Sequence, residues 1–298
     1  MKNVAASVRA RLLNHAKQGN IQFQDLLDQY AMGRFLWRLS QSPFHRLYIL
    51  KGAQLFRIWS SLAHRPTRDL DLMASGPADE TTLLQNFTSV LEAPCEPDDG
   101  LVWGKISTSP IRQEVKYGGV RAILQGTLDK ARVTVQIDVG FGDSILPAPS
   151  ESDWKELLDF PHARMLAYPP ETVIAEKLEA AVVLGIRNSR MKDFFDLDWL
   201  CQNMDFDHGT LRRAILATFE RRGTEWPAEI PFALTDEFGN DSGKTTQWKA
   251  FLRKNRLSGD VFSSVIRRLH GFLVPVIQTE HEDRQQTWTR AAGWQATP

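Results

Sequence analysis

The chain reads Ile49-Leu-Lys-Gly-Ala-Gln-Leu-Phe-Arg-Ile-Trp-Ser-Ser-Leu-Ala-His-Arg-Pro-Thr-Arg-Asp-Leu-Asp-Leu-Met73 between residues 49 and 73. A basic residue stands beside a small-residue turn, a short helix-like run follows, and two aspartates separated by one leucine close the stretch. Because side chains alternate along a strand, Asp69 and Asp71 point to one side of an extended segment and the leucines to the other. Two carboxylates on a polar strand face indicate a site for a divalent metal ion.

The segments around this stretch predict a compact α/β opening. Two amphipathic helices are expected before it, over residues 4–17 and 21–40. A buried strand over 46–50 then passes at Gly52-Ala53 into a helix over 52–59. A helix over 79–92 and adjacent strands over 120–128 and 131–141 follow. In the last strand apolar residues alternate with polar ones, which places Asp138 on the polar face near the strand's end.

After Pro147-Ala-Pro149 the pattern changes from strands to helices, so we expect two domains, residues 1–160 and residues 161–298. The second is expected to be mainly helical, with a loop-rich segment over 222–243 and a disordered end after Thr279. Its expected helices cover residues 170–186, 191–201, 208–221, 245–255 and 260–278.

The composition is that of an ordinary globular chain: 298 residues, 42% apolar and 24% charged. Lys plus Arg and Asp plus Glu number 36 each, which excludes a strongly attractive global field for nucleic acid but not a local basic patch. Cys95 and Cys201 are expected to be free thiols, and the scattered histidines argue against a zinc site. With no signal peptide and no apolar run of membrane length, the expected location is the cytoplasm, with no membrane partner.

The carboxylates suggest phosphoryl or nucleotidyl transfer, in which acidic side chains hold magnesium. Asp138, as a third carboxylate, would bind metal or take the proton from an attacking hydroxyl. The backbone N–H groups of Gly52 and Ala53 would hold a triphosphate. Positive charge would come from basic residues nearby, namely Lys51, Arg57 and Arg68. The alternatives are solvated surface aspartates and a plain strand-to-helix turn.

A second group of charges lies in the helical half. Lys177 sits at the edge of the apolar stripe of its predicted helix, where it would either lie along the surface or bind phosphates. Asp193 and Asp196 are three residues apart on a helix and are able to face one site, although acidic residues also suit a helix N-terminus.

These residues together resemble the AbiEii nucleotidyltransferase toxins, over about residues 48–200. The resemblance is carried by Lys51-Gly52 and by four blocks that follow it in the same order as in the family. These blocks are Arg65-Pro-Thr-Arg-Asp69-Leu-Asp71-Leu, Gln136-Ile-Asp138-Val-Gly-Phe-Gly142, Pro170-Glu-Thr-Val-Ile-Ala-Glu176-Lys177-Leu-Glu-Ala180 and Lys192-Asp193-Phe-Phe-Asp196-Leu. The family is similar in core to DNA polymerase β-type nucleotidyltransferases and is related to the mycobacterial MenT toxins. One departure is Ala53, where many relatives have Gly or Ser.

The resemblance implies an α+β fold: a polymerase β-like core with a mixed or antiparallel sheet flanked by helices, then a mainly helical domain that completes a cleft. It implies that Asp69, Asp71 and Asp138 bind Mg²⁺, with Mn²⁺ as the alternative. Lys177 would contact the nucleotide phosphates, and Asp193 would orient a base, a ribose or the lysine. The implied partners are a nucleoside triphosphate, an RNA acceptor such as a tRNA 3′ end, and an antitoxin encoded nearby, with direct binding left open.

Two other functions stay open: nucleotidyl transfer to a protein or a small molecule, and nucleotide binding without catalysis. The stretch Gly239-Asn-Asp-Ser-Gly243-Lys244-Thr245 imitates a P-loop but has three residues between its glycines where that motif has four. If RNA docks, its phosphates would meet exposed basic residues, namely Arg212-Arg213, Arg221-Arg222, Arg253-Lys254, Arg256, Arg187 and Arg190.

Overall fold

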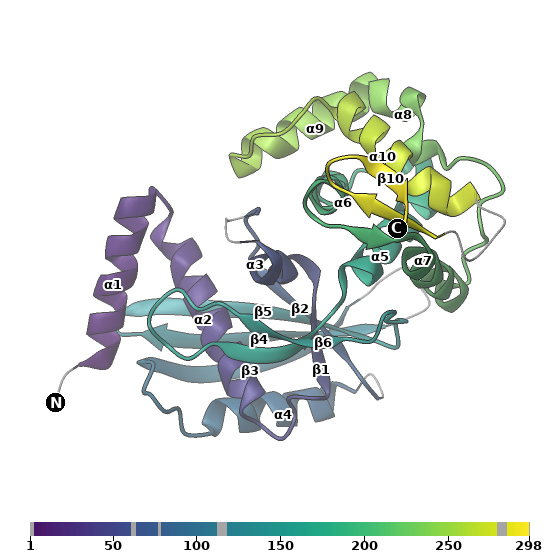
Figure 1. Ribbon diagram of the computed structural model, residues 1–298. Coiled ribbons are helices and arrows are strands. Elements are labelled where there is room, and N and C mark those ends of the chain that lie inside the picture. The colour runs from purple at the N-terminus through teal and green to yellow at the C-terminus, as the bar shows by residue number, and fades with distance from the viewer. Residues whose placement is uncertain (1–2, 61–63, 77–78, 112–117, 279–284, 298) are drawn as a thin grey trace. The chain divides into compact units, whose positions relative to one another are not determined.

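The computed structural model describes residues 3–60, 64–76, 79–111, 118–278 and 285–297. The chain divides into two compact units, each containing its own sheet and helices (Figure 1). The first unit comprises Met1–Gly142 and Ser150–Tyr168, and the second comprises Asp143–Pro149 and Pro169–Pro298. No helix in the described part of the chain combines the length and the apolar character that a membrane crossing needs.

A seven-stranded mixed sheet forms the centre of the first unit, in the order β3-β4-β5-β2-β1-β7-β6. Two of its pairings are parallel, β2 with β5 and β1 with β7, and the other four are antiparallel. The strands are β1 Tyr48–Lys51, β2 Asp69–Ala74, β3 Leu101–Ile111, β4 Gly119–Leu128, β5 Ala131–Phe141, β6 Ser150–Trp154 and β7 Ala163–Ala167. The expected α+β class with a mixed sheet is therefore confirmed.

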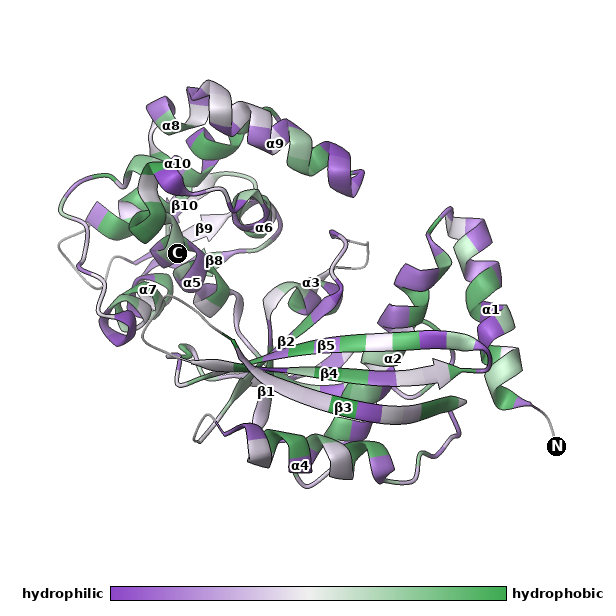
Figure 2. Ribbon diagram, turned by 180° about the vertical axis from the view of Figure 1, so that it is seen from behind, coloured by the Kyte–Doolittle hydropathy of each residue, from purple (hydrophilic) through white to green (hydrophobic). Residues whose placement is uncertain are grey.

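One face of this sheet is apolar and covered by helices. Leu50, Leu72, Val139 and Val120 lie in one register row across β1, β2, β5 and β4, and all are buried. Helices α2 and α4 contact the sheet, and in Figure 2 α2 lies behind β3, β4 and β5. The helices of the first unit are α1 Val4–Gly19, α2 Phe23–Ser40, the short α3 Phe56–Trp59, and α4 Glu80–Glu92.

Aromatic rings join the helices to the sheet. Phe87 of α4 meets Phe35 of α2 with ring centroids 5.1 Å apart and Tyr48 of β1 with centroids 5.3 Å apart. Tyr48 shares the face of Leu50 because strand side chains alternate. The opposite face of the sheet, which carries Asp71, is therefore the one that α2 and α4 leave uncovered.

Three strands of the first unit were not predicted from the sequence. The edge strand β3 has mostly exposed residues and contains Pro110, so it lacks a clear apolar alternation. Strands β6 and β7 are only five residues long. Because β7 pairs with β1 at Ala167 and Leu50, the first unit extends to Tyr168, beyond the expected boundary at residue 160, while Asp143–Pro149 belongs to the second unit.

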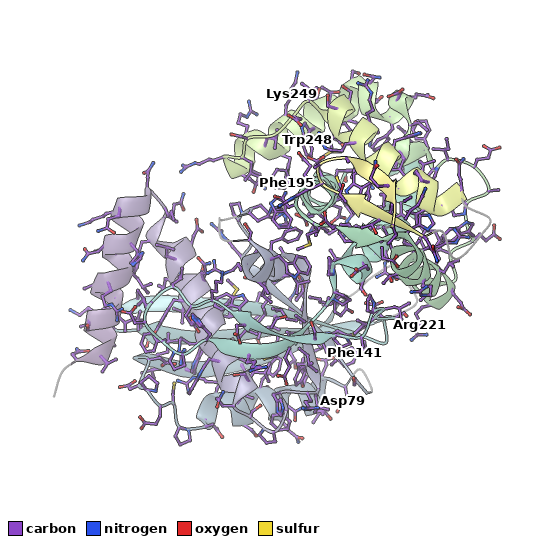
Figure 3. All side chains as sticks on the ribbon, viewed as in Figure 1. Asp79, Phe141, Phe195, Arg221, Trp248 and Lys249 are labelled. Atoms are coloured by element: carbon purple, nitrogen blue, oxygen red, sulfur yellow. The ribbon has the colours of Figure 1, made fainter. Side chains whose placement is uncertain are left out.

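The second unit is mainly helical, as predicted. Pro170 in the first turn and Glu171 at the positive end begin α5 as the sequence suggested. Its elements are α5 Pro170–Leu184, η2 Gly185–Arg187, α6 Met191–Asn203, β8 Phe206–Asp207, α7 His208–Arg222, η3 Phe232–Leu234, α8 Asp236–Asn240, α9 Ser242–Asn255, α10 Phe262–Gln278, β9 Gln286–Thr289 and β10 Gly293–Ala296. Aromatic side chains form much of its core, including Phe195 of α6 beside Trp248 of α9 (Figure 3).

The C-terminal end departs from the expected disorder. Residues 279–284 lie outside the described residues, but β9 and β10 form a hairpin that extends β8 into a three-stranded sheet. Trp288 donates its indole N–H to the Cys201 carbonyl at 2.7 Å, and Trp294 donates to the Phe272 carbonyl at 2.9 Å. The expectation was wrong for the hairpin because these two tryptophans bury it against α6 and α10. Both cysteines are free thiols, as predicted.

A buried charge network lies inside the first unit. Arg34 of α2 contacts Asp99 at 3.5 Å and Glu156 at 3.2 Å, and its guanidinium lies over the rings of Trp37 and Phe160. Burial raises the pKa of Glu156 to about 7, although the Arg34 charge acts in the opposite sense. Burying a carboxylate costs free energy unless it is paired, so this group favours its neutral form.

The pH dependence of stability is expected to report on Glu156. The pKa of Glu156 is higher in the folded state than in the unfolded state, so its proton stabilises the fold. This contribution to stability is complete below about pH 4.5 and is lost as the pH rises through about 7. We expect the unfolding free energy of the wild type to fall by roughly 2–3 kcal/mol relative to Glu156→Gln over that range. Urea denaturation across the pH range measures this. Glu151→Gln, at an exposed glutamate of β6, is the control; parallel curves for wild type and Glu156→Gln would contradict the assignment.

Candidate functional site

Four charged residues form a row across the uncovered face of the first unit's sheet. Lys51 of β1 lies opposite Asp71 of β2, Asp71 opposite Asp138 of β5, and Asp138 opposite Arg121 of β4. Residues in register on neighbouring strands share a face and are about 5 Å apart. The row therefore places two carboxylates side by side with a cation at each end, one residue away from the buried apolar row of Leu50, Leu72, Val139 and Val120.

Asp69 extends this group along the strand. It precedes Asp71 by two residues, so both carboxylates lie on the same face, and Asp69 is the more exposed. The hydrogen bond to Asp138 raises the pKa of the Arg121 guanidinium, and the nearby charges of Asp69 and Asp71 act in the same direction. The predicted cluster of three aspartates is thus brought together in one unit, with Arg121 among them.

Arg121 was not among the residues predicted from the sequence. Its Nε and Nη2 donate to the two oxygens of Asp138, each at 2.7 Å, in the forked arrangement that suits a guanidinium and a carboxylate. Asp138 is accordingly engaged by a cation, and its expected use as a third metal ligand or a base stays a prediction. The available signal was that Arg121 interrupts an apolar strand, but its partner depends on the β4–β5 register.

Gly52 shapes the turn beside Asp71. Its φ of +71° lies in the left-handed region, and a Cβ at this position would overlap Asp71 Oδ2. The turn continues as a short 3₁₀ helix, Gly52–Leu55, followed by the four residues of α3, and Ala53 is buried within it. Close approach of the backbone to a carboxylate is thus the structural reason for glycine here. Lys51 Nζ lies 5.3 Å from the centroid of the Tyr168 ring.

The two arginines predicted to bind phosphates, Arg57 and Arg68, contact other residues of the first unit. Arg57 lies over the ring of Trp154 at 4.7 Å and donates to the Lys155 carbonyl at 3.3 Å. Burial lowers the pKa of Arg57 to about 10. Arg68 pairs with Asp25 of α2 at 3.0 Å. These contacts attach Arg57 to β6 and Arg68 to α2.

The carboxylates suit a magnesium ion by their chemistry. Mg²⁺ prefers oxygen ligands and is commonly held by one or two carboxylates, with substrate phosphates and waters completing its shell. Within the described residues, no group of three or more His, Cys, Asp or Glu side chains is gathered into a metal site. Asp69 and Asp71 on one strand face are a pair that fits this requirement, and Asp138, which bonds Arg121, lies beside Asp71.

The second predicted charge group is assembled within the second unit. Lys177 Nζ contacts Asp193 Oδ1 at 2.6 Å and Asp196 Oδ2 at 2.9 Å, and Arg190 adds a contact to Asp193 at 2.7 Å. Burial acts to lower the pKa of Lys177, but the charges of Asp193 and Asp196 outweigh it and raise the pKa. Asp193 was expected to orient a base, a ribose or the lysine, and the structure shows its contact with Lys177.

Several basic residues of the helical half hold the fold together. Arg212 is buried and donates to the Val276 carbonyl of α10 at 2.7 Å, and Arg222 bonds Glu179 of α5 at 2.8 Å. Lys244, in the stretch that imitates a P-loop, is buried near the start of α9 and donates to the Asn188 carbonyl at 2.8 Å. Arg212 is thus too buried to meet RNA phosphates, and Lys244 serves the packing of α9.

Comparisons with known proteins agree with this fold. The chain resembles JHP933 from Helicobacter pylori, with a TM-score of 0.50 and 16% identity over 86% of this chain and 91% of that chain. A second H. pylori structure, provisionally described as a nucleotidyltransferase, gives a TM-score of 0.49 and 15% identity over 87% and 95%. At 16% identity, the likeness to JHP933 shows a similar fold and nothing about function. No curated protein matches the sequence.

The sequence also matches a protein family over most of its length. The sequence pattern of the family described as "Nucleotidyl transferase AbiEii toxin, Type IV TA system" matches residues 34–267, which include both charge groups. The chain therefore belongs to the AbiEii nucleotidyltransferase toxins of type IV toxin–antitoxin systems.

Proposed function

We propose that this chain is a magnesium-dependent enzyme that transfers a nucleoside monophosphate from a nucleoside triphosphate to RNA in the cytoplasm, with a tRNA 3′ end as the acceptor. The observation that carries the proposal is the row of Lys51, Asp71, Asp138 and Arg121, with Asp69 beside it, on an uncovered sheet face. Family membership supports a nucleotidyltransferase and a toxin with an antitoxin partner.

The row contains complementary groups for a metal-bound triphosphate. Asp69 and Asp71 would hold Mg²⁺, which when bound neutralises charge on the phosphates and activates the attacking oxygen. Lys51 and Arg121 stand at the two ends of the row. Their positive charges would offset the negative charges of the phosphate oxygens. The acceptor hydroxyl releases its proton to solvent as it attacks the α-phosphorus, the bond from that phosphorus to the bridging oxygen breaks, and pyrophosphate leaves.

Asp138 and Asp193 act in this proposal through the cations they hold. The two bonds from Asp138 fix the orientation of the Arg121 fork, and Asp193 with Asp196 fixes the Lys177 ammonium. A preoriented cation stabilises developing charge without reorganisation during the reaction. Lys177 is then the group that would meet the nucleotide, and its two aspartates keep it charged.

The proposal is tested by incubating the purified protein with each labelled nucleoside triphosphate, MgCl₂ and total RNA. We expect label in RNA, and a loss of at least about 100-fold for Asp69→Ala or Asp71→Ala, because the metal would lose half of its protein ligands. Label in protein or in a small molecule would favour those acceptors instead. Nucleotide binding without turnover on any acceptor would favour a regulatory protein.

Gly52→Ala is expected to reduce transfer by roughly 10- to 100-fold, since a methyl group at this positive-φ position overlaps the Asp71 carboxylate and moves it. Gly140→Ala is the matched control on the same face, because a Cβ there meets its nearest atom, Lys51 Nζ, at an ordinary 3.8 Å. Steady-state kinetics with thermal unfolding as a check on folding measures both. Equal activity of the two variants would show that the Gly52 contact does not position Asp71.

A double-mutant cycle separates the roles of Asp138. If Asp138 serves Arg121, then Asp138→Asn and Arg121→Gln each lower kcat/KM by about tenfold, and the double variant is no worse than either single one. A general base would behave differently: Asp138→Asn alone would cost roughly 10²–10⁴-fold. That larger loss, or additive effects of the two substitutions, would contradict the positioning role.

A further inference from the structure

A hollow of about 440 Å³ lies on the sheet of the first unit, away from the charged row. Its lining includes Trp103, Gly126 and Val133, which lie in register on β3, β4 and β5. The Val133 side chain is buried on the side of the sheet that the helices cover. The Trp103 ring lies on that side too, close to where a Cβ on Gly126 would stand. The walls are formed by Val102, Lys105, Gln125, Thr127, Arg132 and Thr134.

The hollow and the carboxylates share one face of the sheet. Thr134 and Arg132 precede Asp138 by four and six residues on β5, and even spacing keeps strand side chains on one side. Gln125 and Thr127 follow Arg121 by four and six residues on β4 and lie opposite Thr134 and Arg132. In Figure 2 this stretch of β3, β4 and β5 lies in front of α2. The polar face is therefore continuous from the charged row to the hollow.

The chemistry of this face favours a polyanion. Lys105 and Arg132 are exposed, and within the described ranges neither side chain forms an ion pair. A β-bulge between Trp103 and Ile106 sets the position of Lys105 on the edge strand. No Asp or Glu stands on this face of β4 and β5 between the charged row and the hollow; the positions there carry Ile123, Gln125, Thr127, Arg132, Thr134 and Gln136.

Spacing relates the hollow to a nucleic-acid strand. At roughly 3.3 Å per strand residue, Thr134 and Arg132 lie roughly 13 and 20 Å from Asp138. A stacked strand carries one phosphate per roughly 3.4 Å, so these distances correspond to roughly four to six nucleotides. Hydroxyl and amide side chains between them offer hydrogen bonds to phosphates and ribose 2′-hydroxyls.

We propose that this hollow is a second binding site, which holds the backbone of a single-stranded RNA acceptor about four to six nucleotides from its reacting end. The inference rests on the proposed function, because it takes RNA as the acceptor. A protein acceptor is disfavoured on this face, since only Val102 among the wall residues is a large exposed apolar side chain. Lys105 and Arg132 contact phosphates, while Thr127, Thr134 and Gln125 contact sugars.

The test compares fluorescent RNA oligonucleotides of 3 and 12 nucleotides by anisotropy, without nucleotide triphosphate. For Lys105→Gln/Arg132→Gln we expect roughly tenfold weaker binding of the 12-mer in 0.1 M salt and no change for the 3-mer. The slope of log K against log salt for the 12-mer is expected to fall by about 1.4, at about 0.7 per phosphate contact. Arg46→Gln/Lys155→Gln removes two exposed charges of the same unit outside β3, β4 and β5 and is the matched control.

Equal loss in both double variants would reduce the effect to net charge and overturn the site, as would equal weakening of the 3-mer and the 12-mer. Preferred transfer of label to protein would also overturn it. The proposed function is judged separately, by transfer of label to RNA in the wild type. Transfer with an unchanged KM for the 12-mer acceptor in Lys105→Gln/Arg132→Gln would remove the second site while leaving the function intact.

Discussion

The parallel pairing of β2 with β5 is the constraint on which the first unit depends. Its register places Asp71 against Asp138 and, one residue later, Leu72 against Val139. Because the side-chain period of a strand is two, a slip by one residue would turn the carboxylates into the core beneath α2 and α4. Burying unpaired carboxylates costs several kcal/mol each. The register that forms the core therefore also assembles the site.

Charge balance follows from the same arrangement. On the uncovered face three carboxylates, Asp69, Asp71 and Asp138, lie beside two cations, Lys51 and Arg121. Both arms of Arg121 hold Asp138, and the other two carboxylates stand on β2. The proposed metal-bound triphosphate would meet carboxylates at the middle of the row and a cation at each end.

Buried charges in both units are held by opposite charges. Arg34 has Asp99 and Glu156, and Lys177 has Asp193 and Asp196. Such groups contribute little net stability, because desolvation offsets much of their attraction, but removing one partner leaves a costly buried charge. In the first unit this links α2 to the segment before β7, and in the second it links α5 to α6. Paired charges thus attach helices within each unit.

The sequence by itself determined the local features. Alternation in residues 131–141 identified the strand and the face of Asp138, the Asp-Leu-Asp spacing identified two carboxylates on one side, and helical periodicity identified most of the second unit. These features depend on neighbours a few residues apart, which is where strand and helix periods act. The aspartate cluster and the Lys177–Asp193 pair were predicted on those grounds and on family resemblance.

Only the tertiary structure decided which distant residues meet. Arg121 was missed because its pairing with Asp138 depends on the register of β4 on β5. The contacts of Arg57 with Trp154 and of Arg68 with Asp25 were not predicted, because these partners lie far away in the sequence. Strands β3, β6 and β7 escaped detection because edge and short strands carry weak apolar patterns and form through pairing. The backbone N–H of Gly52 was expected to hold a phosphate, which stays a prediction; the fold adds that the missing Cβ leaves room for Asp71, a residue more than a dozen positions later.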